Sequence, residues 1–341
     1  METNLLIAPS QNMMMGRSNE WKQDVEDAVL IREQPKQRSP FIESNTNEVT
    51  LDHLKNECII PVFSKDNEVC ISHQSFIESV YEATKDFYHG ETIYTPDIRV
   101  SHTVKGRIPE AINKRTDQLL ESDKTMYYER MIFNIEVPSI TQNVNGNQLN
   151  LSITGCKSYG RDNLSGKMTA QKFSLAVGFL NLACTNQCLS TDGYKEEIRA
   201  TSSGDLYQFT LDLFSQYNVA KHIHLMQSLG DTMLTENQFC QILGRMRLYN
   251  YLPQHQQKEL PRLLITDSQI NSVAKQYIHD DNFAGNNGEL SMWKFYNLIT
   301  GANKNSYLDS FLGRSVNATE VSLGLTEALN HRDEAYAWFI E

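Results

Sequence analysis

Two cysteines four positions apart form the clearest soft-ligand pattern in the sequence. Cys184 and Cys188 enclose Thr-Asn-Gln, and Cys156 precedes them on an expected neighbouring strand. Zinc prefers about four thiolate or imidazole ligands in a tetrahedron, and this gap between cysteines is usable. However, no second pair follows, and His222 and His224 stand two positions apart on an expected helix, where they point to different sides. We therefore expect reduced thiols packed beside a sheet, with no metal and no other cofactor.

The acidic stretch 279–289 (HDDNFAGNNGE) offers many oxygen donors and suggests a calcium loop. An EF-hand loop needs oxygens at positions 1, 3 and 5, glycine at 6 and glutamate at 12. Counted from Asp280, position 5 is Ala284 and position 12 is Ser291, so the pattern fails. We interpret the stretch as a polar, glycine-rich connection between two helices.

Basic side chains gather around glycines in the middle of the chain, a grouping that can follow a phosphate backbone while an aromatic ring stacks on a base. Neither GxxxxGK[ST] nor GxGxxG occurs, so no familiar nucleotide loop is predicted. Ordinary solvated charges around a strand connection remain the alternative. The candidate nucleic-acid-binding residues are Lys157, Tyr159, Arg161, Lys167 and Lys172, with Lys105 and Arg107 from a second basic cluster that includes Lys114 and Arg115.

No group of residues identifies a reaction. The GxSxG turn of serine hydrolases is absent, and serine, histidine and aspartate are too common here for a triad to be selected from spacing. Paired carboxylates cannot be selected either. The sequence therefore predicts no catalytic residue, and we favour a protein that is not an enzyme.

These candidates lie on an expected antiparallel sheet. Two apolar runs, 127–140 and 149–153, flank Asn145-Gly146, a dipeptide that tolerates the positive φ angles of a tight hairpin turn. Residues 173–179 alternate strictly, with four apolar side chains on one face and Ser, Ala and Gly on the other. At least three antiparallel strands are predicted.

Helical periodicity begins near Asp205. Two later helices carry capping-box signals, in which a hydroxyl and a side-chain amide bind the free backbone donors of the first turn. The boxes are Thr235 to Gln238 and Thr266 to Gln269, further helices are expected over 76–87, 110–120, 293–299 and 320–329, and two short strands over 58–71.

The chain is thus predicted to be an α+β protein with an antiparallel sheet, packed helices and a mainly helical C-terminal third. Residues 1–48 are polar and form an expected mobile arm, because such a composition buries too little apolar surface to offset chain entropy. The sheet-bearing region is expected over 49–204, and the helical region packs on it over 205–341.

Charge and hydropathy restrict the classes of partner that the protein is expected to bind. The formal net charge of −11 repels polyanions at long range, so nucleic-acid binding requires basic residues segregated on one face. No stretch approaches the roughly 18 to 20 apolar residues of a membrane span, and no secretory signal is recognisable. We expect a cytoplasmic protein with no membrane partner.

Three segments carry a resemblance to a known family: 94–102, the run from Val177-Gly178-Phe179 to Cys184-Thr185-Asn186, and Trp293 to Lys304. From about residue 90 onward the chain resembles an uncharacterised phage/plasmid-like family of unknown function found on conjugative elements, plasmids and prophages. The resemblance implies a mobile element that handles or protects its DNA, or counters host defence. It supplies no catalytic residue.

Three classes of function follow. The leading hypothesis is a non-enzymatic accessory protein of a mobile element that binds single-stranded nucleic acid through the basic hairpin region. The alternative is a protein-interaction module, for example an inhibitor of a host defence protein. A metal-dependent hydrolase built around Cys184 and Cys188 is the least favoured class. The oligomeric state is not predicted.

Overall fold

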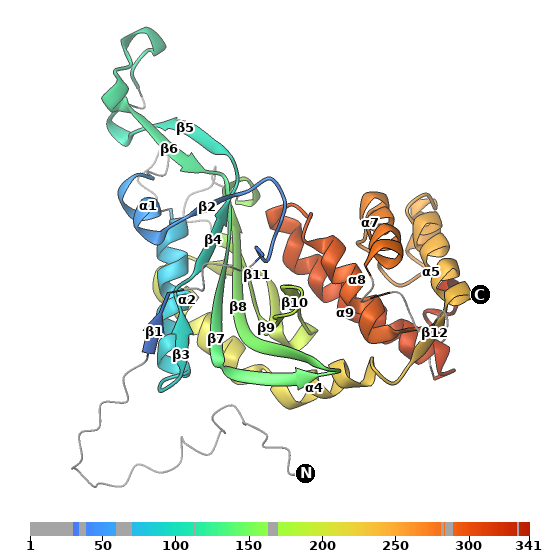
Figure 1. Ribbon diagram of the computed structural model, residues 1–341. Coiled ribbons are helices and arrows are strands. Elements are labelled where there is room, and N and C mark those ends of the chain that lie inside the picture. Colours follow the sequence, from blue (N-terminus) through green and yellow to red (C-terminus); the bar gives the residue numbers. More distant parts are fainter. Residues whose placement is uncertain are drawn as a thin grey trace, which may run out of the picture.

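The computed structural model describes residues 30–33, 39–58, 70–111, 113–162, 170–280, 283, 289–332 and 334–341. These residues form an α+β fold (Figure 1). The strands are β1 (Leu30–Arg32), β2 (Asn47–Val49), β3 (Thr92–Tyr94), β4 (Asp97–Val100), β5 (Thr103–Arg107), β6 (Lys124–Tyr128), β7 (Arg130–Val144), β8 (Asn147–Ser158), β9 (Gln171–Asn181), β10 (Asn186–Cys188), β11 (Tyr194–Ala200), β12 (Met233–Thr235) and β13 (Glu289–Ser291). The helices are α1 (Leu51–Asn56), α2 (His73–Phe87), α3 (Ser203–Gln216), α4 (Val219–Ser228), α5 (Glu236–Tyr249), α6 (Gln254–Gln257), α7 (Asp267–His279), α8 (Met292–Asn303) and α9 (Leu308–Leu329).

The central sheet is antiparallel, with strand order β10-β9-β8-β7-β4-β2, and β11 pairs with the other part of the β9 edge. Its longest pair is the β7–β8 hairpin. Asn145 and Gly146 have φ angles of 49° and 83°, which is the positive-φ turn that the dipeptide predicted. The predicted hairpin, the third strand β9 and the α+β class are confirmed.

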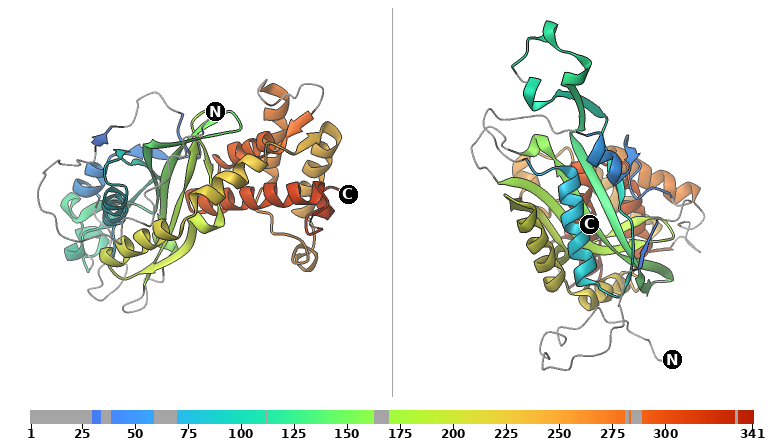
Figure 2. Two further views of the ribbon diagram at one scale, coloured as in Figure 1. Left: turned by 90° about the horizontal axis from the view of Figure 1, so that it is seen from below. Right: turned by 90° about the vertical axis from the view of Figure 1, so that its left-hand side faces the viewer.

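Helices cover both faces of this sheet (Figures 1 and 2). On one face, Phe133 of β7 packs against Phe76 of α2, with ring centroids 5.2 Å apart. On the other face, Phe311 and Leu312 of α9 join a second apolar cluster with Ile132 of β7. Because both faces are covered, the polar and small residues that alternate along β8 and β9 are buried rather than solvated.

The helical region begins where its periodicity indicates. Ser202 caps α3, and both predicted capping boxes form, Thr235 with Gln238 at the start of α5 and Thr266 with Gln269 at the start of α7. None of the helices in the described part of the chain combines the length and apolar character needed to cross a membrane.

Residues 110–120 do not form the predicted helix. Separate 3-10 turns occupy Pro109–Ala111 and Thr116–Gln118, at the tip of a β5–β6 ribbon that stands out from the body (Figure 2). Helices of this length depend on packing for stability, and a projecting tip offers no core to pack against. The short strands expected over 58–71 lie largely outside the described residues.

The described part of the expected N-terminal arm is integrated into the fold. Phe41 and Ile42 are 3% and 1% exposed and belong to the apolar cluster under α9. The backbone N–H groups of Glu43 and Ser44 donate to the carbonyl of Lys304. The burial of these two apolar side chains thus holds residues 39–49 against this face of the sheet.

Candidate functional site

The structure separates the predicted basic residues. Lys157 is 1% exposed, and its Nζ lies 3.0 Å from Asp162 Oδ2 and 3.2 Å from Gln171 Oε1. The ammonium also lies 4.0 Å from the centre of the Phe173 ring. Burial lowers the pKa of Lys157, and the Asp162 carboxylate opposes that effect. Lys157 therefore links β8 to β9 inside the protein and is not accessible to a nucleic acid.

The other described residues of the predicted interface near Lys157 also have partners within the protein. The Tyr159 ring is buried and stacks on His73 with centroids 4.4 Å apart. Arg161 and Lys172 lie beside acidic residues of β11, at 4.0 Å from Glu196 and 3.5 Å from Glu197 respectively. Lys167 lies outside the described residues.

Lys105 and Arg107 lie on the projecting β5–β6 ribbon. In its register Arg107 is opposite Lys124 and Lys105 is opposite Met126. Side chains alternate along a strand, so Lys105, Arg107 and Lys124 share one face of the ribbon. Lys124 contacts Glu121, and Lys114 contacts Asp123 near the tip.

The cysteines pack individually. Cys188 is fully buried, and burial raises the pKa of its thiol to about 12. The Cys156 thiol donates to the carbonyl of Leu308 at 3.2 Å, and His222 pairs with Tyr217. No three His, Cys, Asp or Glu side chains among the described residues are arranged to hold a metal ion. Most of the acidic stretch 279–289 lies outside the described residues.

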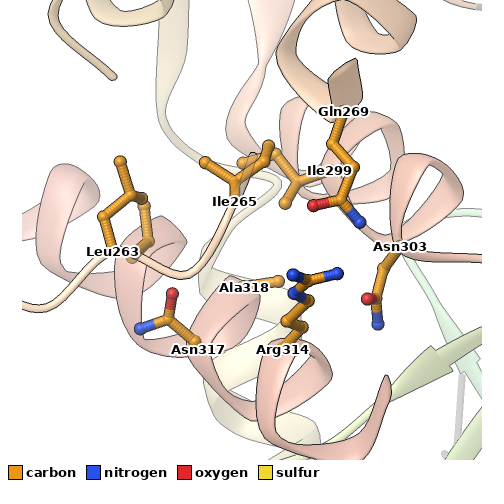
Figure 3. A pocket seen from close by; sticks show the side chains of 9 residues that line it. Leu263, Ile265, Gln269, Ile299, Asn303, Arg314, Asn317 and Ala318 are labelled. Atoms are coloured by element: carbon orange, nitrogen blue, oxygen red, sulfur yellow. The ribbon is translucent and has the colours of Figure 1, made fainter. Parts of the chain in front are cut away.

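A small cavity lies between α7, α8 and α9 (Figure 3). Its volume of about 20 Å³ is close to the space that a single water molecule requires. The Arg314 guanidinium reaches into it and donates to Ser306 Oγ at 2.8 Å. This size excludes a small-molecule ligand.

A much larger cleft lies over the sheet, with a volume of about 640 Å³. This size falls within the range of small-molecule sites, roughly 300 to 1,000 Å³. Strands β4 and β7 supply its floor, and the segment from residue 39 to α1 forms one wall. Lining residues include Phe41, Glu48, Asp52, Asp97, Arg99, Asn134, Glu136, Leu180 and Thr185.

The floor of the cleft is polar although it is buried. Asn134 and Glu136 are 2% and 1% exposed and lie on the same face of β7. Asn134 Oδ1 accepts from Thr154 Oγ1 at 2.8 Å, and Glu136 Oε1 accepts from Asn150 Nδ2 at 2.5 Å. Burying a carboxylate is costly unless it is hydrogen-bonded, and the Asn150 amide supplies one of the interactions that hold Glu136 in this position.

The charges in the cleft are mostly negative. Arg99 Nε lies 3.1 Å from Asp97 Oδ1, and its Nη2 lies 3.0 Å from Glu48 Oε2. Burial raises the pKa of Asp97, while Arg99 lowers it. Asp97 is a half-buried carboxyl with a raised pKa in a concave site, a combination that is more frequent at functional positions.

Two segments that carry the family resemblance meet at one end of the cleft. Thr185 lines the cleft, and its Oγ1 accepts from Lys304 Nζ at 2.7 Å. Asn186 Nδ2 donates to the carbonyl of Asn297 at 2.8 Å. Thr185 has a φ angle of 52°, which is unusual for a β-branched residue and is held by these contacts. The Cys-Thr-Asn turn and the Thr-Gly-Ala-Asn-Lys segment therefore form one junction.

Sequence reasoning missed the cleft, although two signals pointed to it. Glu136 is the single charged residue between Met131 and Val137, an otherwise mostly apolar run. The alternation of Asn150, Ser152 and Thr154 with apolar residues in β8 was a second sign of a polar layer. Only the strand register shows that the two signals lie side by side.

The fold and the cleft define a class: an α+β protein with a polar cleft on a helix-covered antiparallel sheet. The chain belongs to the family described as "Domain of unknown function, B. Theta Gene description (DUF3871)", whose model matches residues 24–340. The match begins before residue 90, so it includes part of the segment expected to lie outside the resemblance. No curated protein and no solved structure matches the chain.

Proposed function

We propose that this protein binds a small polar molecule in the cleft over β4 and β7. The observation that carries the proposal is Glu136, a carboxylate 1% exposed at the floor of a cleft of about 640 Å³. A purely structural layer would be more stable with apolar side chains of similar volume, because buried charges are costly to desolvate. A polar ligand in the cleft gives this polar floor a functional role in addition to its internal hydrogen bonds.

The test is a thermal-shift screen of the full-length protein against a library of small polar metabolites, followed by calorimetry of each hit. Thr95 lines the cleft, and Thr95→Trp is expected to fill part of it and to abolish binding of the hits. Thr103→Trp, at an exposed position on β5, is the matched control and should bind as the wild type does. Hits that bind the Thr95→Trp protein with unchanged affinity would remove the proposal.

A second candidate function is nucleic-acid binding by an accessory protein of a mobile element, and the ribbon favours it. Arg107 and Lys124 lie directly opposite each other and share a face with Lys105, so three basic side chains gather on one face of the ribbon. A two-stranded ribbon also fits a nucleic-acid groove, and basic side chains can follow a single strand. The net charge of −11 opposes binding, so we expect it to be strongly salt-dependent.

Mobility shift with single-stranded and duplex oligonucleotides at two salt concentrations tests this candidate. Lys105→Ala with Lys124→Ala should weaken binding at low salt, whereas Lys221→Ala, an exposed position on α4, should not. If the wild-type protein shows no salt-sensitive shift, the ribbon does not bind nucleic acid.

A further inference from the structure

One end of the cleft holds a hydroxyl and an amine in direct contact. Thr185 lines the cleft and is 6% exposed, and its Oγ1 lies 2.7 Å from Lys304 Nζ. The same Oγ1 lies 3.5 Å from the carbonyl oxygen of Pro40, whose two chain neighbours, Ser39 and Phe41, also line the cleft. The hydroxyl therefore lies where that wall of the cleft meets the β9–β10 turn.

Lys304 is positioned by both its backbone and its side chain. It follows the last residue of α8, and its carbonyl accepts from the N–H groups of Glu43 and Ser44. Its Nζ lies 3.7 Å from Glu43 Oε1, beyond ordinary hydrogen-bond length, so the Thr185 hydroxyl is the closer contact. Burial lowers the pKa of Lys304, whereas Glu43 and the Cys184 thiol oppose this effect. The neutral amine, which is a base, is thus more populated here than on a solvated lysine.

The backbone at Thr185 is held in an uncommon conformation. Its φ angle of 52° lies in the left-handed region, which a β-branched residue rarely adopts. Such strain gathers at functional sites when the surroundings hold it in place. Here the hydroxyl is also 2.7 Å from the carbonyl oxygen of Cys184, and the next residue, Asn186, donates to the carbonyl of Asn297. The turn thus holds one hydroxyl in a fixed position beside the amine.

A hydroxyl beside a buried amine is the arrangement of a nucleophile with its base. An aliphatic hydroxyl is a weak nucleophile until an adjacent base accepts its proton, and lysine serves as this base in serine–lysine enzymes. The two groups need to lie within about 2.6 to 3.2 Å of each other, which the contact of 2.7 Å satisfies. A lysine held only for its charge would contact its carboxylate directly, as Lys157 does with Asp162 at 3.0 Å. The sequence did not reveal this pair, because its members are 119 positions apart.

Building on the proposed function, we propose that Thr185 and Lys304 form a nucleophile–base pair that cleaves a carboxylic ester bound in the cleft. Lys304 Nζ takes the hydroxyl proton while Thr185 Oγ1 bonds to the ester carbonyl carbon. The carbon–oxygen bond to the alcohol then breaks, the alcohol leaves with the proton from Lys304, and the acyl group stays on Thr185. Water attacks the acyl carbon in the same way, gives a proton to Lys304, and releases the acid as that proton returns to Thr185. One ester and one water become one acid and one alcohol.

The charges of the cleft restrict the ester. Glu48, Asp52 and Asp97 line it, and Arg99 is already held by Glu48 and Asp97. Clefts lined by one sign of charge repel ligands of the same sign. The substrate class is therefore an ester that carries no negative charge.

The experiment uses p-nitrophenyl acetate, an uncharged ester whose alcohol absorbs light once it is released. With the full-length protein we expect a burst of about one equivalent of p-nitrophenolate per chain, and peptide mass spectrometry of the acid-quenched protein should find the acetyl group on Thr185. Thr185→Val keeps the branched shape and should abolish both signals, whereas Thr185→Ser keeps the hydroxyl and should retain them. Thr103→Val, at an exposed position on β5, is the matched control and should behave as the wild type does.

Two lysine variants separate a base from a structural contact. Lys304→Arg keeps the positive charge beside Glu43, but a guanidinium does not lose its proton in proteins and cannot act as a base. Acylation should be slower by about a hundredfold or more in Lys304→Arg and in Lys304→Met, and unchanged in Lys221→Arg, an exposed position on α4. Circular dichroism identifies any variant that does not fold, and Lys304→Arg decides if Lys304→Met is one of them.

Three results would overturn this inference. They are a wild-type protein without acetyl on Thr185, an acetyl group found only at exposed nucleophiles such as Cys240, and acylation of Thr185 at the wild-type rate in folded Lys304→Arg. The library screen measures binding independently of acylation. Hits that bind the cleft in a protein that is never acylated would keep the proposed function and remove only the catalytic pair.

Discussion

Acidification is expected to destabilise the protein through two buried histidines. His73 is 5% exposed, and its Nε2 donates to the carbonyl of Tyr128 at 2.8 Å while Nδ1 has no partner among the described residues. His222 is fully buried beside Tyr217, and its Nε2 likewise has no partner in the described part of the chain. Burial lowers the pKa of His73 to about 3 and that of His222 to about 4.

The magnitude follows from proton linkage. Between these values and the ordinary histidine pKa of about 6.5, the unfolded chain binds protons that the folded chain does not, so stability falls as the pH falls. At pH 5 each histidine favours unfolding by roughly 1.5 pH units times 1.36 kcal/mol, or about 2 kcal/mol. The two together should lower the free energy of unfolding by about 4 kcal/mol relative to pH 8.

Urea denaturation followed by circular dichroism at pH 8, 6.5 and 5 measures this effect. His73→Gln and His222→Gln should each reduce the loss between pH 8 and pH 5 by about 2 kcal/mol, whatever they do to stability at pH 8. His224→Gln, at an exposed position on the same helix as His222, is the control and should follow the wild type. If both buried-histidine variants kept the full wild-type loss, the reasoning would be refuted.

Three further predictions concern backbone and charge, all measured by urea denaturation. Gly146→Ala should lower the free energy of unfolding by about 1 to 2 kcal/mol, because the φ angle of Gly146 is 83°. Gly244→Ala is the control: this position on α5 has open space around it, and the change should stabilise the protein by about 0.5 to 1 kcal/mol. Equal effects would contradict the turn assignment. Gly193→Ala should cost at least about 2 kcal/mol, since a Cβ would lie 2.1 Å from the Val177 carbonyl oxygen, and a neutral result would exclude this close approach. Lys157→Ala should lower the free energy of unfolding by about 3 to 5 kcal/mol because it leaves Asp162 buried without its cation. Lys85→Ala removes a surface pair with Glu82 and should cost less than about 1 kcal/mol. Similar losses in the two variants would place Lys157 in solvent.

Features decided by neighbours in the chain were predictable from the sequence. The Asn145-Gly146 turn, the capping boxes at Thr235 and Thr266, and the start of helical structure near Asp205 all formed as expected. Each depends on the φ preference of a residue or on a hydrogen bond within one helical turn, and such interactions are present whatever the rest of the chain does. The helix over 110–120 failed because its stability depended on packing that the ribbon tip does not provide.

The candidate site depended on contacts between distant residues. Lys105 and Lys157 look alike in the sequence, yet one lies on an exposed ribbon face and the other is sealed between Asp162 and an aromatic ring. The cleft unites Glu48, Asp97 and Glu136, which only strand register brings together. The sequence alone determined the local elements and the polar residues available to them. The tertiary structure decided which of these residues are buried and which line the cleft, because burial depends on packing between segments far apart in the chain.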